Sequence, residues 1–377
     1  MSGRSWTDLL GRTYAYDPYV AAPIADLEIA TSEATTFAVA EASRALGTVP
    51  AMPGAGIASV LYRSESSASS IIEDIKVGPR RVLEAEAAGD DEIRDPIADR
   101  IVRNLKGLRN AFTTPYPGKS DDYLRWHRLL MENHPRLKPE DIGAYRTQQN
   151  WIGGDAYGPR NAVFIPPAPE DVGLLIEDLA RYTARTNIAP VVQAVVAHAR
   201  FEVIHPFVDG NGRVGRMLTQ HVLAGRLKIH APVPISIPWA RDTDAYIDGL
   251  RSFQAGDMDR WIEFAAMSIV DAVRWMHTVE QRVSSLIASL DDRSRSRGKS
   301  VASQVILDLP DHPLVDAETV ADRYGVSRQA AHEALTRLSE DGVLDERSFS
   351  RRIRAGRPRQ MFSNTELIAL LGEIVTG

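Results

Sequence analysis

The sequence contains no cysteine, which excludes disulfide bonds and thiolate metal sites. It also lacks the run of about eighteen apolar residues that a membrane-spanning helix needs. Its first residues lack the apolar core of a secretory signal. A net charge of -6 argues against nucleic-acid binding over the whole surface, although a local basic patch is compatible with it. We therefore expect a cytoplasmic protein with no membrane partner.

What remains is a globular composition with a mainly helical pattern. The length of 377 residues allows two or three folding units. Apolar periodicity and helix-forming residues predict helices over 31–46, 90–133, 170–185, 191–204 and from about 214 to 290, with an interruption near Pro115 and Pro117. Ser69 or Ser70 is expected to cap a further helix that carries Ile71, Ile72, Glu73 and Ile75.

Two segments have a different texture. Residues 146–167 are rich in glycine and proline, and we expect a short hairpin or an extended loop there. Residues 291–300, DDRSRSRGKS, form a polar and charge-dense linker candidate.

The most informative stretch is HPFVDGNGRVGR, from His205 to Arg216. Its Gly-Asn-Gly core can adopt backbone angles that bulkier residues avoid, and the helix expected to follow directs free N–H groups at the loop. Arg213 and Arg216 add fixed charge suited to phosphate, and Asp209 is an oxygen ligand suited to Mg2+. His205 titrates near neutrality. Each residue alone is more often an ordinary turn, helix-end or surface residue, but together they suit attack of a hydroxyl group on phosphorus.

This segment resembles the Fic family signature, His-Pro-Phe-x-Asp/Glu-Gly-Asn-Gly-Arg-x-x-Arg, without a departure. The resemblance implies an adenylyltransferase that moves AMP from ATP to a Ser, Thr or Tyr hydroxyl of a target protein or of itself. It implies that His205 is the catalytic base and that Asp209 holds Mg2+. The other roles that it implies are phosphate binding by Gly210, Asn211, Gly212, Arg213 and Arg216, and inward packing by Phe207.

Two further segments are similar to family features. Residues 149–167 resemble the Fic flap, a hairpin whose edge aligns the target chain. Ser69 to Asp74 resembles the inhibitory motif Ser/Thr-x-x-x-Glu followed by Gly or Asn, in which Glu73 would pair with Arg216 and block the γ-phosphate. Asp74 departs from that pattern, which puts the strength of inhibition in question. Glu73 has two alternatives: an ordinary surface residue, or a residue that positions water to remove AMP.

Two aromatic residues downstream fall where the family places rings around the nucleotide. Tyr246 is expected to face adenine by stacking, with core packing as the alternative. For Trp261 we favour core packing.

The C-terminal segment resembles a winged helix-turn-helix. Gly325 to Ser327 forms the expected tight turn, and Ser327 is a good cap for the second helix. The expected wing carries six arginines, at positions 347, 351, 352, 354, 357 and 359. Such a patch suits DNA phosphates, but the acidic residues of the segment leave a protein-binding module open.

The sequence thus predicts a mainly α fold, with a Fic-type helical bundle, a small β-hairpin flap and a C-terminal winged helix-turn-helix. The expected domains are a helical extension with the inhibitory helix over 1–90, a catalytic domain over 91–290 and the winged helix over 301–377. The alternatives are an enzyme that removes AMP or transfers another nucleotide, and a DNA-binding regulator that senses nucleotide. The resemblance also leaves open a homodimer, on which relief of Glu73 would depend.

Overall fold

The fold comes from a computed structural model, which describes residues 4–7, 11–51, 53–54, 56–88, 95–154, 158–295, 298, 300–348 and 360–376. The chain divides into two compact units, and each collects three stretches of sequence. The first unit contains Met1–Arg44, Lys106–Lys228 and Asp244–Met267, and the second contains Ala45–Leu105, Ile229–Thr243 and Ser268–Gly377. The three domain boundaries that the sequence suggests stay a prediction.

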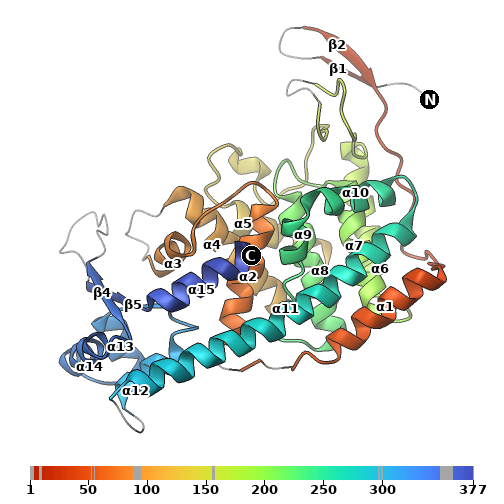
Figure 1. The fold of residues 1–377 in the computed structure, drawn as a ribbon. Helices are drawn as coiled ribbons and strands as arrows, with labels where there is room; N and C mark the ends of the chain where they lie inside the picture. Colours follow the sequence, from red (N-terminus) through yellow and green to blue (C-terminus); the bar gives the residue numbers. More distant parts are fainter. Residues whose placement is uncertain are drawn as a thin grey trace. The chain divides into compact units, whose positions relative to one another are not determined.

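The described elements are mainly helices, with two small antiparallel sheets, as the sequence predicts (Figure 1). The first unit contains β1 Arg4–Thr7, β2 Thr13–Tyr16, α5 Ser120–Met131, α6 Val172–Ala184, α7 Pro190–Ile204, α8 Asn211–Leu227 and α10 Thr243–Gln254. The second contains α2 Ile57–Ile71, α3 Pro79–Ala87, α9 Ser236–Arg241, α12 Val301–Asp308, β3 Leu314–Val315, α13 Ala317–Tyr324, α14 Arg328–Glu340, β4 Asp345–Ser348, β5 Gln360–Ser363 and α15 Thr365–Thr376. Four helices contribute residues to both units: α1 Glu33–Leu46, α4 Pro96–Thr113, α11 Met258–Arg293, and α10, whose first residue Thr243 belongs to the second unit. None of the described helices is long and apolar enough to cross a bilayer.

The core of the first unit is the pair α7 and α8, which lie side by side in Figure 1. Every residue of α7 from Val191 to Ile204 is buried, because α6 also packs against this helix. The two helices approach closely at Gly215, where an added Cβ would lie 2.9 Å from Glu202 Oε1. The apolar stripe predicted over 191–204 is therefore the central helix of this unit.

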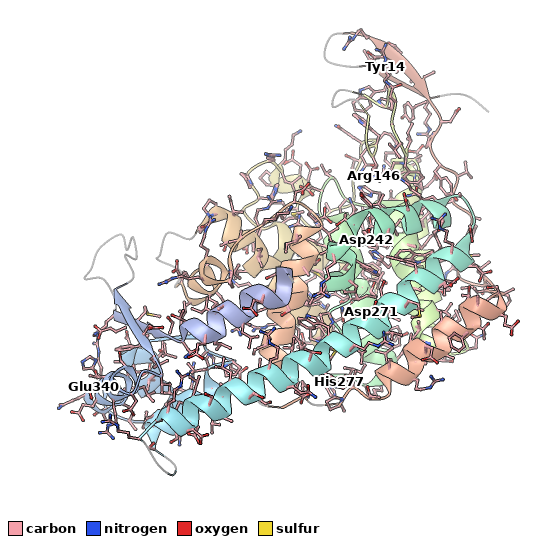
Figure 2. All side chains as sticks on the ribbon, in the orientation of Figure 1. Tyr14, Arg146, Asp242, Asp271, His277 and Glu340 are labelled. Atoms are coloured by element: carbon pink, nitrogen blue, oxygen red, sulfur yellow. The ribbon has the colours of Figure 1, made fainter. Side chains whose placement is uncertain are left out.

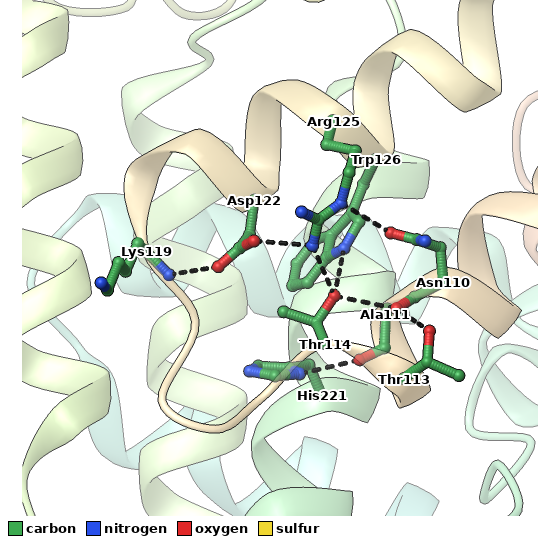
Figure 3. Close-up of polar contacts among 9 residues, drawn as sticks. All are labelled: Asn110, Ala111, Thr113, Thr114, Lys119, Asp122, Arg125, Trp126 and His221. Carbon is green, nitrogen blue, oxygen red and sulfur yellow. Dashed lines mark hydrogen bonds and ion pairs between the residues drawn. The ribbon is translucent and has the colours of Figure 1, made fainter.

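A polar network fixes the connection between α4 and α5 (Figure 3). The Thr114 hydroxyl accepts hydrogen bonds from Arg125 (2.9 Å) and from the Trp126 ring (3.2 Å), and it donates to the Asn110 carbonyl (2.8 Å). His221 of α8 lies 2.9 Å from the Ala111 carbonyl, so its Nδ1 carries the proton. These bonds tie α5 and α8 to the end of α4, and α5 also contacts α8 directly.

The N-terminal hairpin was not predicted from the sequence. β1 and β2 pair antiparallel, with Arg4 opposite Tyr16 and Thr7 opposite Thr13. Trp6 meets Trp151 edge to face, with ring centroids 5.1 Å apart. Figure 2 labels Tyr14 on this hairpin and Arg146 at the start of the glycine- and proline-rich segment. The hairpin therefore packs on the segment expected to form the flap.

The glycine- and proline-rich segment over 146–167 does not form a regular β-hairpin. Its described residues form a loop closed by one antiparallel bridge, between Ile152 and Phe164. The bridge is supported by the Val163 N–H, which donates to the Ile152 carbonyl (2.8 Å). Residues 155–157 lie outside the described part of the chain. The expectation of a hairpin or an extended loop is met by this bridged loop.

The expected helix cap at Ser69 or Ser70 is wrong. α2 begins at Ile57 after Gly56, and both serines lie in its last turns, buried. The Ser70 hydroxyl donates to the Ser66 carbonyl one turn earlier (2.7 Å), which satisfies it inside a helix. Because serine has a small side chain, the serine-rich sequence of α2 suits a buried helix and does not mark a helix start here.

The C-terminal residues form a helix-turn-helix beside a three-stranded sheet. α13 ends at Gly325 in the left-handed conformation (φ 66°), and the Ser327 hydroxyl caps α14 by accepting from the Ala330 N–H (3.1 Å). The predicted turn and cap are therefore confirmed. The strand order is β3-β5-β4, and both pairings are antiparallel. Of the six expected wing arginines, Arg347 lies in β4, and those from 351 to 359 fall outside the described residues.

Candidate functional site

The junction between α7 and α8 brings most of the predicted site residues together. α7 ends at Ile204, and His205 follows in the left-handed conformation (φ 48°) that a non-glycine residue rarely adopts. α8 begins at Asn211 after Gly210 (φ 84°). Because glycine carries no side chain to cap the helix, the first N–H groups of α8 face the loop without a cap from that residue. This end of α8 is a site suited to an anion.

Asn211 closes the loop with its side chain. Its Oδ1 accepts from the Phe207 N–H (2.8 Å), and its Nδ2 donates to the Phe207 carbonyl (2.9 Å). Phe207 is fully buried and stacks on the His127 ring at 3.9 Å. The inward packing expected of Phe207 is therefore confirmed, and Asn211 has a structural role beside its predicted phosphate role.

His127 supports the same loop from α5. Its Nδ1 accepts from the Gly143 N–H (2.9 Å), so its Nε2 carries the proton and donates to the Asp209 carbonyl (3.1 Å). Burial lowers the pKa of His127 to about 4, which keeps the ring neutral at pH 7. Sequence reasoning missed this residue, because a lone histidine in a helix gives no signal of its partner.

Arg146 is the second residue that the sequence did not reveal. Its guanidinium is buried and donates to backbone carbonyls of His205 (2.8 Å), Ile204 (3.4 Å), Gln148 (3.3 Å) and Pro167. The backbone N–H of Arg146 donates to the Pro206 carbonyl (2.9 Å). Burial lowers the pKa of Arg146 to about 10. Arg146 thus ties the start of the flap segment to the turn that carries His205.

His205 and Asp209 are the partly exposed functional groups of the loop. The side chain of His205 is 20% exposed, and its Nδ1 lies 4.0 Å from Glu202 Oε2 on the preceding turn of α7. The Asp209 side chain is 44% exposed, and its Oδ1 accepts from the Gly210 N–H (2.6 Å). His134 Nε2 lies 3.8 Å from Asp209 Oδ2. An imidazole and a carboxylate therefore meet solvent from one short loop.

The described residues contain no group of three or more histidine, aspartate or glutamate side chains that would hold a metal by themselves. A magnesium ion does not require one, since it commonly uses one or two carboxylates together with substrate phosphates and water. The exposed carboxylate of Asp209, next to an anion-binding helix end, fits that pattern.

The two signature arginines are almost fully buried, each 1% exposed. Arg213 Nη2 lies 3.8 Å from Asp209 Oδ1. Arg216 donates to the Tyr246 hydroxyl (3.3 Å), which also lies 2.9 Å from His198 Nε2. Burial and the nearby Arg216 charge lower the pKa of His198 to about 3. The α8 arginines are thus held in place by packing and by neighbouring polar groups.

Tyr246 is therefore placed differently from the expectation of an open ring face. Its side chain is 3% exposed and its ring lies beside those of His198 and Trp261. Stacking on adenine stays a prediction, and the Tyr246 hydroxyl contacts Arg216 and His198. Trp261 is fully buried and donates to the Val195 carbonyl (2.8 Å), as expected of core packing.

Glu73 lies in the second unit, in the turn that follows α2. The Ile75 N–H donates to the Ser70 carbonyl (3.0 Å) and the Asp74 N–H to the Ile71 carbonyl (2.9 Å), which is a Schellman ending. Asp74 takes the left-handed position (φ 57°) that favours Gly or Asn. The departure at Asp74 therefore keeps the backbone conformation that those residues would provide.

Comparison with known proteins agrees with this geometry. A profile of the Fic/DOC family matches residues 117–223. "Protein adenylyltransferase Fic" of Drosophila erecta is 32% identical over 192 residues, which are 50% of this chain and 35% of the relative. The Drosophila melanogaster protein of the same name is 31% identical over 192 residues, 50% of this chain and 36% of its own length. The chain thus matches only about a third of the length of these relatives.

Solved structures share the fold. A Fic family protein from Desulfovibrio desulfuricans aligns with a TM-score of 0.55 at 22% identity, over 93% of this chain and 98% of that one. Fic-1 (residues 134–508) from C. elegans aligns with a TM-score of 0.50 at 18% identity, over 66% of this chain and 73% of that one. The matched segment holds the loop, α7 and most of α8, and this part of the chain is similar to the Fic/DOC family.

Proposed function

We propose that this protein is a protein adenylyltransferase, which transfers AMP from ATP to a Ser, Thr or Tyr hydroxyl of a target protein or of itself. The observation that carries the proposal is the loop from His205 to Arg216. It combines a partly exposed imidazole and carboxylate with two buried arginines at an uncapped helix end. The names of the Drosophila relatives support the same reaction.

In the proposed reaction the hydroxyl oxygen of the target attacks the α-phosphorus of ATP. His205 accepts the hydroxyl proton, a bond forms between that oxygen and phosphorus, and the bond to the β-phosphate oxygen breaks. Pyrophosphate leaves and AMP stays on the target. Glu202, 4.0 Å from His205 Nδ1, stabilises the imidazolium that proton transfer creates.

The phosphates would lie against the start of α8. Gly210, Asn211 and Gly212 would bind these phosphates, and Arg213 and Arg216 would compensate the charge of the β- and γ-phosphates. Asp209 would hold Mg2+, which neutralises charge on the phosphates when it is bound. Tyr246 positions the guanidinium of Arg216 through the hydroxyl contact at 3.3 Å.

Glu73 is proposed to be inhibitory. A carboxylate that pairs with Arg216 competes for the guanidinium with the γ-phosphate. The ordered ending of α2, with Asp74 in the left-handed position, supports a fixed placement of Glu73 relative to its own helix. Removal of the carboxylate is expected to raise transfer.

The proposal is tested with Mg2+ and ATP labelled on the α-phosphate or on the γ-phosphate. The compared proteins are wild type, Glu73→Gly, and Glu73→Gly combined with His205→Ala, alone and with added lysate. Protein-bound label from the α-phosphate alone, stronger in Glu73→Gly and lost with His205→Ala, is expected. Label from neither phosphate in any protein contradicts adenylylation.

An AMP-removing or other nucleotide-transferring activity keeps the same site. It predicts release of AMP from a labelled target, or label from another nucleotide donor, both lost with His205→Ala. The same panel of proteins therefore distinguishes the reactions.

The C-terminal elements support a second candidate role. α12, β3, α13, α14, β4 and β5 follow one another as in a winged helix, and we propose that this region binds DNA. Fluorescence anisotropy of a labelled duplex at about 50 and 200 mM salt tests the role, because phosphate contacts weaken steeply with salt. Absence of binding at both salt levels favours a protein-binding module.

We also propose that the protein forms a homodimer, and that relief of the inhibition by Glu73 depends on its assembly or dissociation. A solution mass that stays that of one chain at all active concentrations contradicts this.

A further inference from the structure

A cavity lies in the second unit and is lined by residues of that unit. Its volume is about 730 Å³, within the range of about 300–1,000 Å³ typical of small-molecule sites. Its walls come from α2, the 76–79 segment, the start of α3, the end of α9 and the last turns of α15. The proposed adenylyl transfer uses none of these residues.

Most of the wall is apolar. Ile71, Val77, Pro79, Leu83 and Leu371 present hydrocarbon from four different segments. A ligand with an apolar body would remove this surface from water, which favours binding.

The charged groups at the cavity are all basic. Lys76 and Arg241 are exposed, and neither has an ion-pair partner among the residues that the structure describes. Arg63 also lines the cavity, but its guanidinium is bound by Glu86 and by the carbonyls of Pro310 (2.7 Å) and Asp311 (2.6 Å). No aspartate or glutamate is among the described lining residues. The rim therefore has two cations available for an anion.

Two independent features add polar groups to the same wall. Ser64 is 1% exposed and also lines the cavity. α3 begins at the cavity with Gly78 and Pro79 and has no side-chain cap, so its positive end opens there.

We propose that this cavity binds an amphiphilic anion, with a carboxylate or phosphate head at Lys76 and Arg241 and an apolar body against α2, α3 and α15. The cavity also touches both sides of the Glu73 turn, through Ile71 before it and Lys76 after it. A bound ligand therefore holds this turn in its Schellman conformation. This regulatory step rests on the inhibitory role proposed for Glu73, whereas binding itself does not.

Binding is tested by calorimetry with dodecanoate and dodecyl phosphate below their micelle concentrations, and with dodecylamine and dodecanol for comparison. One anion per chain is expected, with either head group, and much weaker binding of the amine and the alcohol. Preference for one anionic head identifies the carboxylate or the phosphate as the natural group. Equally tight binding of dodecylamine overturns the proposal.

Substitutions locate the site. Lys76→Ala and Arg241→Ala are each expected to weaken dodecanoate binding up to about fivefold, because an exposed ion pair contributes up to about 1 kcal/mol. Ser67→Phe places a ring in the cavity from α2 and is expected to abolish binding, with thermal unfolding measured to show that the variant folds. The exposed residues Lys138 and Arg260 provide matched controls as alanine variants. Equal affinity of the Lys76, Arg241 and control variants overturns the proposal.

Regulation is tested with the α-labelled ATP assay. Saturating dodecanoate is expected to lower transfer by wild type and to leave Glu73→Gly unaffected. Equal inhibition of both proteins, or no inhibition of wild type, overturns the regulatory step. If no protein transfers label, adenylylation itself is contradicted, and the calorimetry still decides whether the cavity binds the anion.

Discussion

Replacement of Arg146 by alanine is the sharpest test of how the loop is held. The guanidinium donates to the carbonyls of His205, Ile204, Gln148 and Pro167, and the residue is 3% exposed. Its removal leaves these acceptors in a buried space that water fills incompletely. The turn that carries His205 loses its main side-chain support.

The magnitude follows from these contacts. A hydrogen bond to a charged group contributes about 1.5–3 kcal/mol, and loss of one partner of a buried charged network costs about 3–5 kcal/mol. We expect Arg146→Ala to lower the free energy of unfolding of the first unit by about 3–5 kcal/mol. Arg146→Lys keeps the charge but has a single ammonium group in place of the planar fork, so an intermediate loss of about 2 kcal/mol is expected.

The assay combines urea unfolding with amide hydrogen exchange of residues 204–207 and with α-label transfer in the Glu73→Gly background. Arg160→Ala is the matched control, since Arg160 lies on the same segment, is exposed and contacts the Tyr14 ring at 5.0 Å. The control is expected to change stability by at most about 1 kcal/mol. The reasoning is refuted if Arg146→Ala unfolds within about 0.5 kcal/mol of wild type and transfers label at the same rate.

Three further predictions concern single positions. Asp74→Gly is expected to raise the free energy of unfolding by up to about 1 kcal/mol, and Asp74→Ala to lower it, because φ is 57° there; equal urea midpoints for the two variants would contradict this. The pKa of His127 is about 4 in the folded chain and 6.5 in the unfolded chain, so the unfolded chain binds the proton first as pH falls. About 3 kcal/mol of stability is therefore lost between pH 6.5 and pH 4. In urea unfolding, the free energy of unfolding of His127→Gln should fall less steeply with pH over this range than that of wild type, and identical pH dependences would count against the prediction. Gly215→Ala, whose Cβ would lie 2.9 Å from Glu202 Oε1, should lower the melting temperature. Gly173→Ala, at an exposed position of α6 with nothing within 4 Å, should leave the melting temperature equal or raise it. A higher melting temperature for Gly215→Ala than for Gly173→Ala would contradict the close approach of α7 and α8.

Much of the fold could be predicted because its signals are local in the sequence. The apolar stripe over 191–204 and the loop glycines mark α7, the turn and α8 within about 35 residues. The Gly325 and Ser327 pair marks the C-terminal turn in the same way. Such elements follow from side-chain periodicity and backbone freedom alone.

The missed features depend on partners that are distant or lack a side-chain signature. Arg146 binds backbone carbonyls, which look alike at every position in a sequence, and three of the four belong to residues about twenty to sixty positions away. The cap predicted at Ser69 or Ser70 is wrong because serine usually marks a helix start. Here the serines belong to a buried helix, in which the neighbouring Glu65 accepts hydrogen bonds from the Ser236 N–H (3.0 Å) and hydroxyl. Tertiary packing overrides the local preference in both cases.

The Schellman ending of α2 fixes Glu73 relative to its own helix through the last turn alone. The last turn of a helix opens at lower free energy than the helix as a whole, because it has fewer hydrogen bonds to break. Here opening costs the bonds of the Glu73, Asp74 and Ile75 N–H groups to Ser70 and Ile71. Ile75 is buried in an apolar cluster with Val82 and Ile101, so it anchors the far side of the turn. Release of Glu73 from this placement would therefore need one turn to open, with the rest of α2 and Ile75 still in place.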